Sequence, residues 1–274
     1  LRGVASAIYS SSTQAADTGS TYSDRFPSFD FNGFTVGSSH SGSNSDGDNF
    51  VAWCWKAGGN KNTFNVDDVG YASAAAAGLD GGSLAVTGAS VGTKQGFSII
   101  KFASGSSGNK TLSHGLLETP TFILVKTTGA SSDWSIYHKD LGGTVNNYLV
   151  FGTAANATAS NIWGAAVPTS SVFGINPGTT CATSQDVIAY LWHDVPGLQK
   201  FGSFEGNDNA NGTFVELGFK PAIVWVKAID SAATVGGSAA TSWGMWDSAR
   251  MPNNPAGNPL FANLSTDENV RGNG

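Results

Sequence analysis

The sequence predicts an all-β fold made of tandem antiparallel β-sandwich modules of a jelly-roll-like kind. Three observations predict it: short runs of β-branched and aromatic residues, turn-forming residues between these runs, and a segment that occurs more than once. The Ala- and Ser-rich stretches 10–17 and 72–78 lack an apolar stripe at helical spacing. We therefore expect sheets packed face to face and little helix.

The repeated segment organises the chain. Residues 96–126 and 198–227 each contain a short apolar run, a turn rich in Gly, Ser or Asn, a proline, and an apolar run that ends in lysine. The proline and the lysine are equally spaced in both: Pro120 with Lys126, and Pro221 with Lys227. A repeat of this length is a small domain rather than one turn of a solenoid.

Two further matches set the frame of the repeat. Residues 132–138 correspond to residues 241–247, and residues 31–55 correspond to residues 171–192. The predicted division is a C-terminal half-module at 1–59, an extended linker at 60–95, a complete β-sandwich module at 96–197, and the N-terminal portion of a further module at 198–274. We call the three modules the first, second and third units. Either the chain is a window on a longer polypeptide, which we favour, or half-units complete each other or a neighbouring chain.

The expected strands follow from local pattern. Phe50–Trp55 and Trp134–His138 alternate in part between large and small side chains, which is typical of a strand with one buried face. Val187–Trp192 is apolar throughout, as in a strand covered on both faces. Phe122–Lys126 and Ile223–Lys227 each follow a proline, which is tolerated at the entrance of a strand.

Two joints separate the units. Residues 60–95 contain the low-information stretch 67–78, so we expect them to run extended along the surface. The second joint, His193–Gly197, is short, and Pro196 fixes one of its backbone angles. The second and third units should therefore keep a fixed mutual orientation.

Composition excludes several classes of protein. Charged residues make up 12% of the chain, about half the usual share, while 16 Phe and 8 Trp supply material for packed cores. The net charge is −6 and Lys and Arg do not cluster, so we expect no nucleic-acid partner. No run approaches the roughly 18 apolar residues that span a membrane, so we expect no membrane insertion.

Metal, cofactor and thiol chemistry find little support in the sequence. The histidines are His40, His114, His138 and His193, and none stands in a zinc-binding spacing. We expect them to be exposed or packing residues, with no metal and no cofactor. Cys54 and Cys181 stand at non-equivalent places in their units, which indicates two free thiols.

Acidic turns leave two alternatives open. Residues 46–49 and 207–209 carry the oxygen ligands that Ca²⁺ prefers, but the spacing and closing Glu of a calcium-binding hand are missing, and plain Asp/Asn turns explain the same residues. Asp133 and Asp140 are candidates for the two carboxylates of a glycosidase, although nothing distinguishes them from ordinary turn residues. We expect no catalytic residue and no enzymatic activity.

The aromatic residues have two possible roles. Trp134, Tyr137, Trp163, Trp243 and Trp246 could stack on the faces of sugars. Trp134 and Trp243 occupy the same place in two units, and a residue that each unit needs for its own core would recur in the same way. Core packing is the favoured alternative, and glycan contact by Trp134, Tyr137, Trp243 and Trp246 is the other.

The pattern Gly-Asp-Asn-Phe-Val-Ala-Trp-Cys-Trp-Lys-Ala-Gly-Gly at 47–59 resembles a repeat module of phage virion proteins, especially those of aquatic tailed phages. The stretch from Gly96 to Gly142 resembles the same module. Such modules occur in long chains labelled tail fibre, appendage or structural protein, some of which also carry lectin-like sandwich domains. The resemblance covers about 26–59 and 96–250, and it implies no catalytic residues.

The resemblance implies a non-enzymatic virion protein, namely a tail-fibre or appendage segment that contributes to attachment to the host. Its partners would be other virion proteins, copies of itself in a homo-oligomer such as a trimer, and a host-surface glycan. The first alternative is a capsid-decorating or tail-coating protein without a receptor. The second is a polysaccharide-degrading spike, which would need a groove with two close carboxylates.

Overall fold

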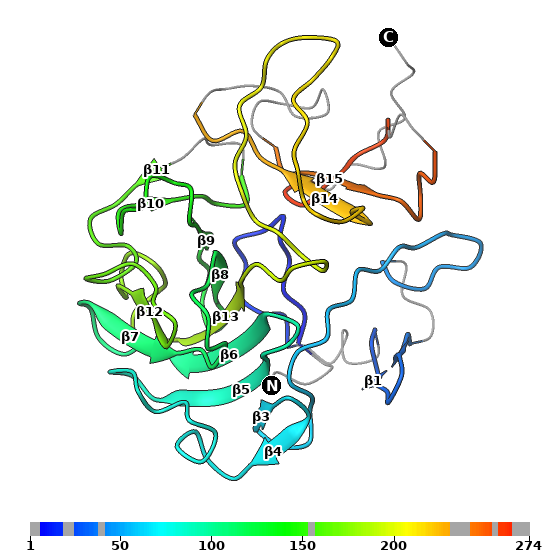
Figure 1. Cartoon of the computed structure of the whole chain (residues 1–274). Helices are drawn as coiled ribbons and strands as arrows, with labels where there is room; N and C mark the ends of the chain where they lie inside the picture. Colours follow the sequence, from blue (N-terminus) through cyan, green and yellow to red (C-terminus); the bar gives the residue numbers. More distant parts are fainter. Residues whose placement is uncertain are drawn as a thin grey trace.

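The structure is a computed structural model that describes residues 6–18, 25–37, 42–152, 157–230, 242–253 and 257–264. Within these ranges the chain forms strands, turns and loops and no helix (Figure 1), so the predicted all-β fold is confirmed. His40 lies outside the described residues.

A seven-stranded sheet forms the body of the protein, in the order β4-β3-β5-β6-β13-β8-β9. Its strands are β3 (Phe64–Val66), β4 (Val69–Tyr71), β5 (Val86–Gly92), β6 (Phe97–Ala103), β8 (Phe122–Thr127), β9 (Trp134–His138) and β13 (Asp186–Trp192). Neighbours are antiparallel except β3 and β5, which are parallel. The sequence predicted antiparallel strands throughout, so this pair is a correction.

Four smaller sheets complete the fold. β7 (Lys110–Ser113) pairs with β12 (Val172–Ile175), β1 (Ser28–Phe29) with β2 (Phe34–Thr35), and β10 (Asn147–Tyr148) with β11 (Ala157–Thr158). β14 (Ile223–Val226), β15 (Gly244–Asp247) and β16 (Leu260–Phe261) form the three-stranded sheet drawn in orange and red in Figure 1.

Two apolar cores cover the two faces of the central sheet. Successive residues of β8 alternate between them, because side chains of a strand point to opposite faces in turn: Ile123 and Val125 belong to the first core, Phe122 and Leu124 to the second. The small β7–β12 sheet closes the first core, where the ring of Phe173 meets that of Phe102. The β14–β15–β16 sheet contributes Trp243 and Met245 to the second core.

The prediction of an extended linker at 60–95 is wrong. This stretch contains β3, β4 and β5, and β5 pairs with β6 along its length. Val86, Ala89 and Val91 are buried in the first core. The small residues that resembled a linker instead allow close packing: a Cβ on Gly82 would lie 2.6 Å from the Thr111 carbonyl oxygen.

The described residues of the first and third units contain few strands. Phe50–Trp55, for which the sequence predicts a strand, lies in none. Residues 198–217 also contain no strand, and part of this stretch forms the yellow loop that projects from the body in Figure 1. The division of the chain into units stays a prediction.

Candidate functional site

The same lysine–tryptophan arrangement occurs at two hairpins. Lys126 of β8 faces Trp134 of β9. In β14–β15, Val226 faces Gly244, and continuing this register by one residue places Lys227 opposite Trp243. Because Lys126 and Lys227 are also equivalent in the sequence repeat, the two hairpins share both their sequence match and their pairing register.

The N-terminal segment binds the first of these hairpins. Trp134 Nε1 donates a hydrogen bond to the Tyr9 carbonyl oxygen at 3.0 Å, and Lys126 Nζ donates to the Thr13 carbonyl oxygen at 3.0 Å. Lys126 Nζ also donates to the Ser132 carbonyl oxygen. Burial of Lys126 lowers its pKa, and the nearby Asp133 carboxylate partly opposes this effect. We call this arrangement the first clasp.

Residues 150–152 of the second unit bind the other hairpin in the same way. Trp243 Nε1 donates to the Val150 carbonyl oxygen at 2.9 Å, and Lys227 Nζ donates to the Gly152 carbonyl oxygen at 3.1 Å. Burial lowers the pKa of Lys227 to about 8. We call this arrangement the second clasp. In both clasps, backbone carbonyls from an earlier part of the chain satisfy a lysine and a tryptophan of a later hairpin.

The structure places three of the four predicted glycan-contact residues inside the cores. Trp134, Tyr137 and Trp243 are 7%, 6% and 4% exposed. Glycan contact is therefore wrong for these three, because stacking on a sugar needs an accessible ring face, and the alternative of core packing holds. Trp246 is half-buried. Trp163 is fully buried and donates from Nε1 to the Asn147 carbonyl oxygen.

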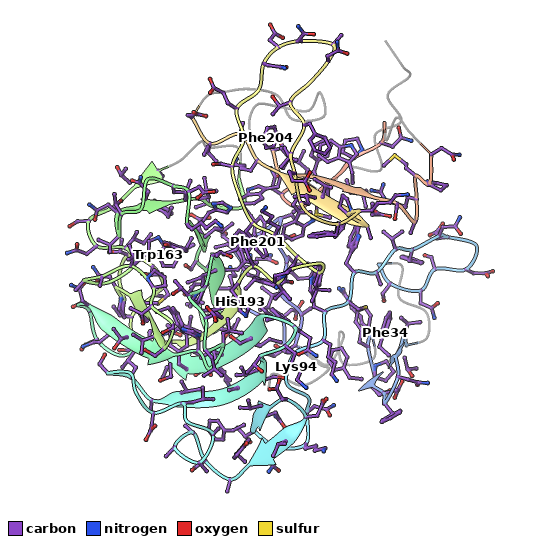
Figure 2. The ribbon with its side chains drawn as sticks, in the orientation of Figure 1. Phe34, Lys94, Trp163, His193, Phe201 and Phe204 are labelled. Atoms are coloured by element: carbon purple, nitrogen blue, oxygen red, sulfur yellow. The ribbon has the colours of Figure 1, made fainter. Side chains whose placement is uncertain are left out.

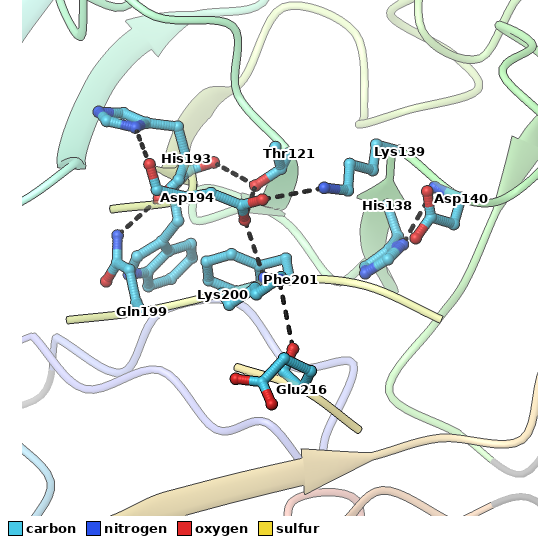
Figure 3. A network of polar contacts seen from close by, with 11 residues as sticks. Thr121, His138, Lys139, Asp140, His193, Asp194, Gln199, Lys200, Phe201 and Glu216 are labelled. Carbon is cyan, nitrogen blue, oxygen red and sulfur yellow. Dashed lines mark hydrogen bonds and ion pairs between the residues drawn. The ribbon is translucent and has the colours of Figure 1, made fainter. Parts of the chain in front are cut away.

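A polar network fixes the joint between the second and third units (Figure 3). Asp194 Oδ2 forms an ion pair with Lys139 at 3.0 Å, and Asp194 Oδ1 accepts a hydrogen bond from the Phe201 amide at 2.8 Å. Gln199 Nε2 donates to the carbonyl oxygens of Gln95, Gly96 and His193. These contacts bind the segment that follows Gly197 to residues that precede it in the chain.

A hollow of about 480 Å³ lies beside this joint, between Lys94, Glu118 and His193 (Figure 2 labels Lys94 and His193). The Nε2 atom of His193 is buried and has no hydrogen-bond partner among the residues that the structure describes, while its Nδ1 atom lies 2.7 Å from the Asp194 carbonyl oxygen. Asp194 itself is already engaged by Lys139 and by the Phe201 amide. The wall of the hollow is therefore part of the joint.

Two further histidines, His114 and His138, and the two cysteines show no sign of a catalytic or metal-binding role within the described residues. His114 is fully buried, with Nε2 3.0 Å from the Thr169 carbonyl oxygen, and burial lowers its pKa to about 4. His138 is half-buried, and burial lowers its pKa also. Cys54 and Cys181 are free thiols, as predicted, and burial raises the pKa of Cys181 to about 12.

The acidic candidates do not converge. Asp133 and Asp140 are exposed and flank β9 at its two ends, about 16 Å of strand apart, which is too far for a glycosidase pair. The Asn207 and Asn209 side chains accept hydrogen bonds from the amides two residues on, which is the geometry of a plain Asx turn. Within the described ranges, no three His, Cys, Asp or Glu side chains are grouped as metal ligands, and no helix is long and apolar enough to cross a membrane.

Exposed aromatic side chains were missed as a candidate site. They lie in the first and third units; Figure 2 labels Phe34 and Phe204. The largest exposed fractions belong to Phe31 (106%), Phe214 (83%), Phe29 (64%), Phe204 (53%), Phe50 (50%) and Trp55 (44%). The repeat could have signalled them, because Phe50 and Trp55 correspond in sequence to the buried Val187 and Trp192.

No curated protein and no solved structure is significantly similar to the chain. One family matches, over residues 1–274, and it is described as a domain of unknown function, DUF7483. Because the match covers the whole sequence, the chain belongs to the DUF7483 family.

Proposed function

We propose that the chain is a non-enzymatic structural protein of a phage virion, in which it forms a segment of a tail fibre or appendage and contributes to attachment to the host. The observation that carries the proposal is the pair of equivalent clasps. The first clasp binds the hairpin β8–β9 to an earlier part of the chain through Trp134 and Lys126. The second clasp binds the hairpin β14–β15 in the same way through Trp243 and Lys227.

Clasps of this kind suit a mechanical role. When successive modules interlock through buried hydrogen bonds, the joint resists bending and pulling better than a flexible linker would. The network of Asp194 and Gln199 adds a second set of contacts at the same boundary. A stiff row of modules is what an extended appendage requires.

The exposed aromatic residues supply surfaces for partners. Phe29, Phe31 and Phe34 lie together on the β1–β2 hairpin, and exposed apolar groups gathered in this way are typical of protein–protein contact sites. Their partners would be other virion proteins or copies of the chain, arranged as a homo-oligomer such as a trimer. A host-surface glycan remains a proposed ligand, with the half-buried Trp246 as the residue of the predicted set that is still accessible to it. Many weak contacts at the tip of a fibre would sum to useful avidity.

A capsid-decorating or tail-coating role is the second candidate, since exposed apolar edges would also be covered in a shell of neighbouring subunits. Immunogold electron microscopy separates the two roles. Antibodies raised against the chain would be applied to purified phage particles from the system that encodes it, with antibody pre-absorbed on the chain as the control. Label on tail appendages is expected, label spread over the capsid would favour decoration, and unlabelled particles would contradict a virion role.

A further inference from the structure

The hairpin β14–β15 presents a strand edge that is occupied in the equivalent hairpin β8–β9. In the central sheet β8 lies between β9 and β13. Within the described residues, β14 pairs with β15 alone. Val224 and Trp225 of β14 are 40% and 37% exposed, whereas Ile123 and Leu124 at the equivalent places in β8 are 0% and 6% exposed.

The strand that would fill this edge is present elsewhere in the chain. Segment 49–55, Asn-Phe-Val-Ala-Trp-Cys-Trp, corresponds in sequence to β13, Asp-Val-Ile-Ala-Tyr-Leu-Trp. In β13 the final residue, Trp192, is 8% exposed, whereas Trp55 is 44% exposed. Phe50 and Val51 are likewise 50% and 42% exposed. Segment 49–55 therefore has the sequence of a central strand but lies in no sheet; its exposed residues flank Trp53, which packs on the second core, and Trp55 also meets the edge of the Trp192 ring.

A second complementary pair lies on the same two half-units. In the second unit, Phe173 of β12 faces Leu112 of β7, and both are fully buried. Phe34 in the first unit, 39% exposed, corresponds to Phe173. Phe214 in the third unit, 83% exposed, corresponds to Leu112 when Asn109–Leu112 is aligned with Asn211–Phe214, one residue out of step with the proline and lysine match. The first unit thus exposes the equivalents of β12 and β13, and the third unit exposes the equivalents of the strands that pair with them.

We infer that segment 49–55 of one copy of the chain adds as an antiparallel strand to the free edge of β14 in a second copy. The register follows from β13 and β8, in which Leu191 faces Ile123 and Trp192 faces Phe122. The corresponding partners are Trp55 with Ile223, Cys54 with Val224, Trp53 with Trp225, Ala52 with Val226, and Val51 with Lys227.

The main-chain ladder supplies the attraction, and burial of Phe50, Trp55 and Val224 adds to it, as in other cases of strand addition to a sheet edge. Each copy carries one donor strand and one acceptor edge. The contact is therefore head-to-tail and generates a row of copies, unless two copies exchange strands reciprocally and close as a dimer. The strand pairing does not depend on a place in a virion. Immunogold labelling therefore tests the virion role, and disulfide trapping tests the pairing separately.

Disulfide trapping tests both the contact and its register. Cys54 is the exposed thiol of the chain and Cys181 is buried. In the Val224→Cys variant the new thiol faces Cys54 of another copy, at the separation that facing residues of antiparallel strands share with disulfides. Mild oxidation should give a ladder of linked species, or a closed dimer with two links, on a non-reducing gel. Peptide mapping should join the Cys54 peptide to the peptide that carries position 224.

Three controls make the result specific. The Trp225→Cys variant places its thiol one residue out of register, and the double variant Cys54→Ser with Val224→Cys removes the partner thiol, so both should lose the cross-link. The Val51→Pro variant removes one N–H of the proposed main-chain ladder between segment 49–55 and β14. It should abolish association in sedimentation experiments. Because Val51 is exposed and lies outside every strand, the change should not unfold the chain. Free thiols after oxidation of Val224→Cys, a link within one copy, or a concentration-independent monomer mass for the unaltered chain would overturn the inference.

Discussion

The Lys227 Nζ atom lies 5.8 Å from the centroid of the Trp243 ring, over its face. The pair also binds two backbone carbonyls of the second unit, those of Gly152 and Val150. A cation over an indole ring is attracted by the negative face of the ring, and the attraction grows where water is excluded. The second clasp therefore combines a cation–π contact with two hydrogen bonds, and it joins segments far apart in the sequence.

The hydrogen bond from Trp243 should contribute measurably to stability. Trp243→Phe keeps an aromatic ring in the second core and removes the bond from Nε1 to the Val150 carbonyl oxygen. We expect the free energy of unfolding to fall by about 1–2 kcal/mol, from the lost bond and the smaller ring. Chemical denaturation measures the change. Phe31→Leu, at a fully exposed aromatic residue, is the control and should change the free energy by less than about 0.5 kcal/mol.

Removing the buried ammonium of Lys126 should loosen the N-terminal segment. Lys126→Met leaves the Thr13 and Ser132 carbonyl oxygens without this donor. The Thr13 oxygen keeps the hydrogen bonds from the Ser132 amide and the Ser131 hydroxyl, whereas the Ser132 oxygen loses its lysine donor. We therefore expect a loss of about 1–2 kcal/mol. Hydrogen exchange should accelerate at the Ala16 amide, which donates to the Thr128 carbonyl oxygen. Unchanged exchange there, with Lys101→Met as the comparison, would show that Lys126 does not hold the segment.

His114 should make the fold sensitive to acid. Its Nδ1 accepts a hydrogen bond from the Leu116 amide, which favours the neutral ring, and burial lowers its folded-state pKa from 6.5 to about 4. The unfolded chain therefore binds a proton between pH 6.5 and pH 4 that the folded chain does not. The contribution of His114 to the free energy of unfolding is fully present above pH 6.5, and it should fall by about 3 kcal/mol as the pH drops to 4.

The variant His114→Gln isolates this contribution, since burial also lowers the pKa of His138 and adds to the total slope. Unfolding free energies of both proteins would be compared at pH 7 and pH 4.5. The variant should lose less stability than the unaltered chain over this interval, and equal losses would rule out His114 as a source.

Gly174 should tolerate no side chain. A Cβ built on this residue of β12 would lie 2.1 Å from the Trp163 carbonyl oxygen, a backbone atom that cannot move aside. Gly174→Ala should therefore destabilise the fold by about 3 kcal/mol or prevent folding. Gly206, on the projecting loop, has nothing within 4 Å of its Cβ position. A thermal melt of Gly206→Ala should match that of the unaltered chain.

The sequence predicted the strands whose patterns are local. β8, β9 and β13 lie where the apolar runs at 122–126, 134–138 and 187–192 were expected. β13 is apolar because the two cores cover both of its faces, as its continuous pattern indicated: Val187 and Leu191 belong to the first core and Trp192 to the second. Such strands can be predicted from local sequence, because the hydrophobicity of each side chain reflects whether that position is buried.

Strands made of small residues could not be predicted in this way. β5 reads Val-Thr-Gly-Ala-Ser-Val-Gly, and its pairing with β3 is parallel and depends on residues distant in sequence. Its small residues resemble those of a linker, although a Cβ on Gly92 of β5 would lie only 3.2 Å from the Ala57 carbonyl oxygen. Propensity is a weak guide where tertiary packing decides the structure.

The candidate site was predictable in part. The recurrence of Trp134 and Trp243 indicated a core role, which their burial confirms. The carbonyls that bind them, at Tyr9 and Val150, could not be identified from the sequence. Every residue has a backbone carbonyl, so the residue type does not indicate which one accepts the hydrogen bond. The Asp194 network escaped for a similar reason: its partners Lys139 and Phe201 come from separate segments.

Quantitative mass spectrometry of purified phage particles tests the proposed fibre role most directly. Peptides of this chain would be counted against those of the major capsid protein and of a tail protein in the same particles, and the intact mass of the mature polypeptide would be recorded. A copy number close to that of the tail protein is predicted. A copy number close to that of the capsid protein, or the absence of the chain from particles, would contradict the fibre role.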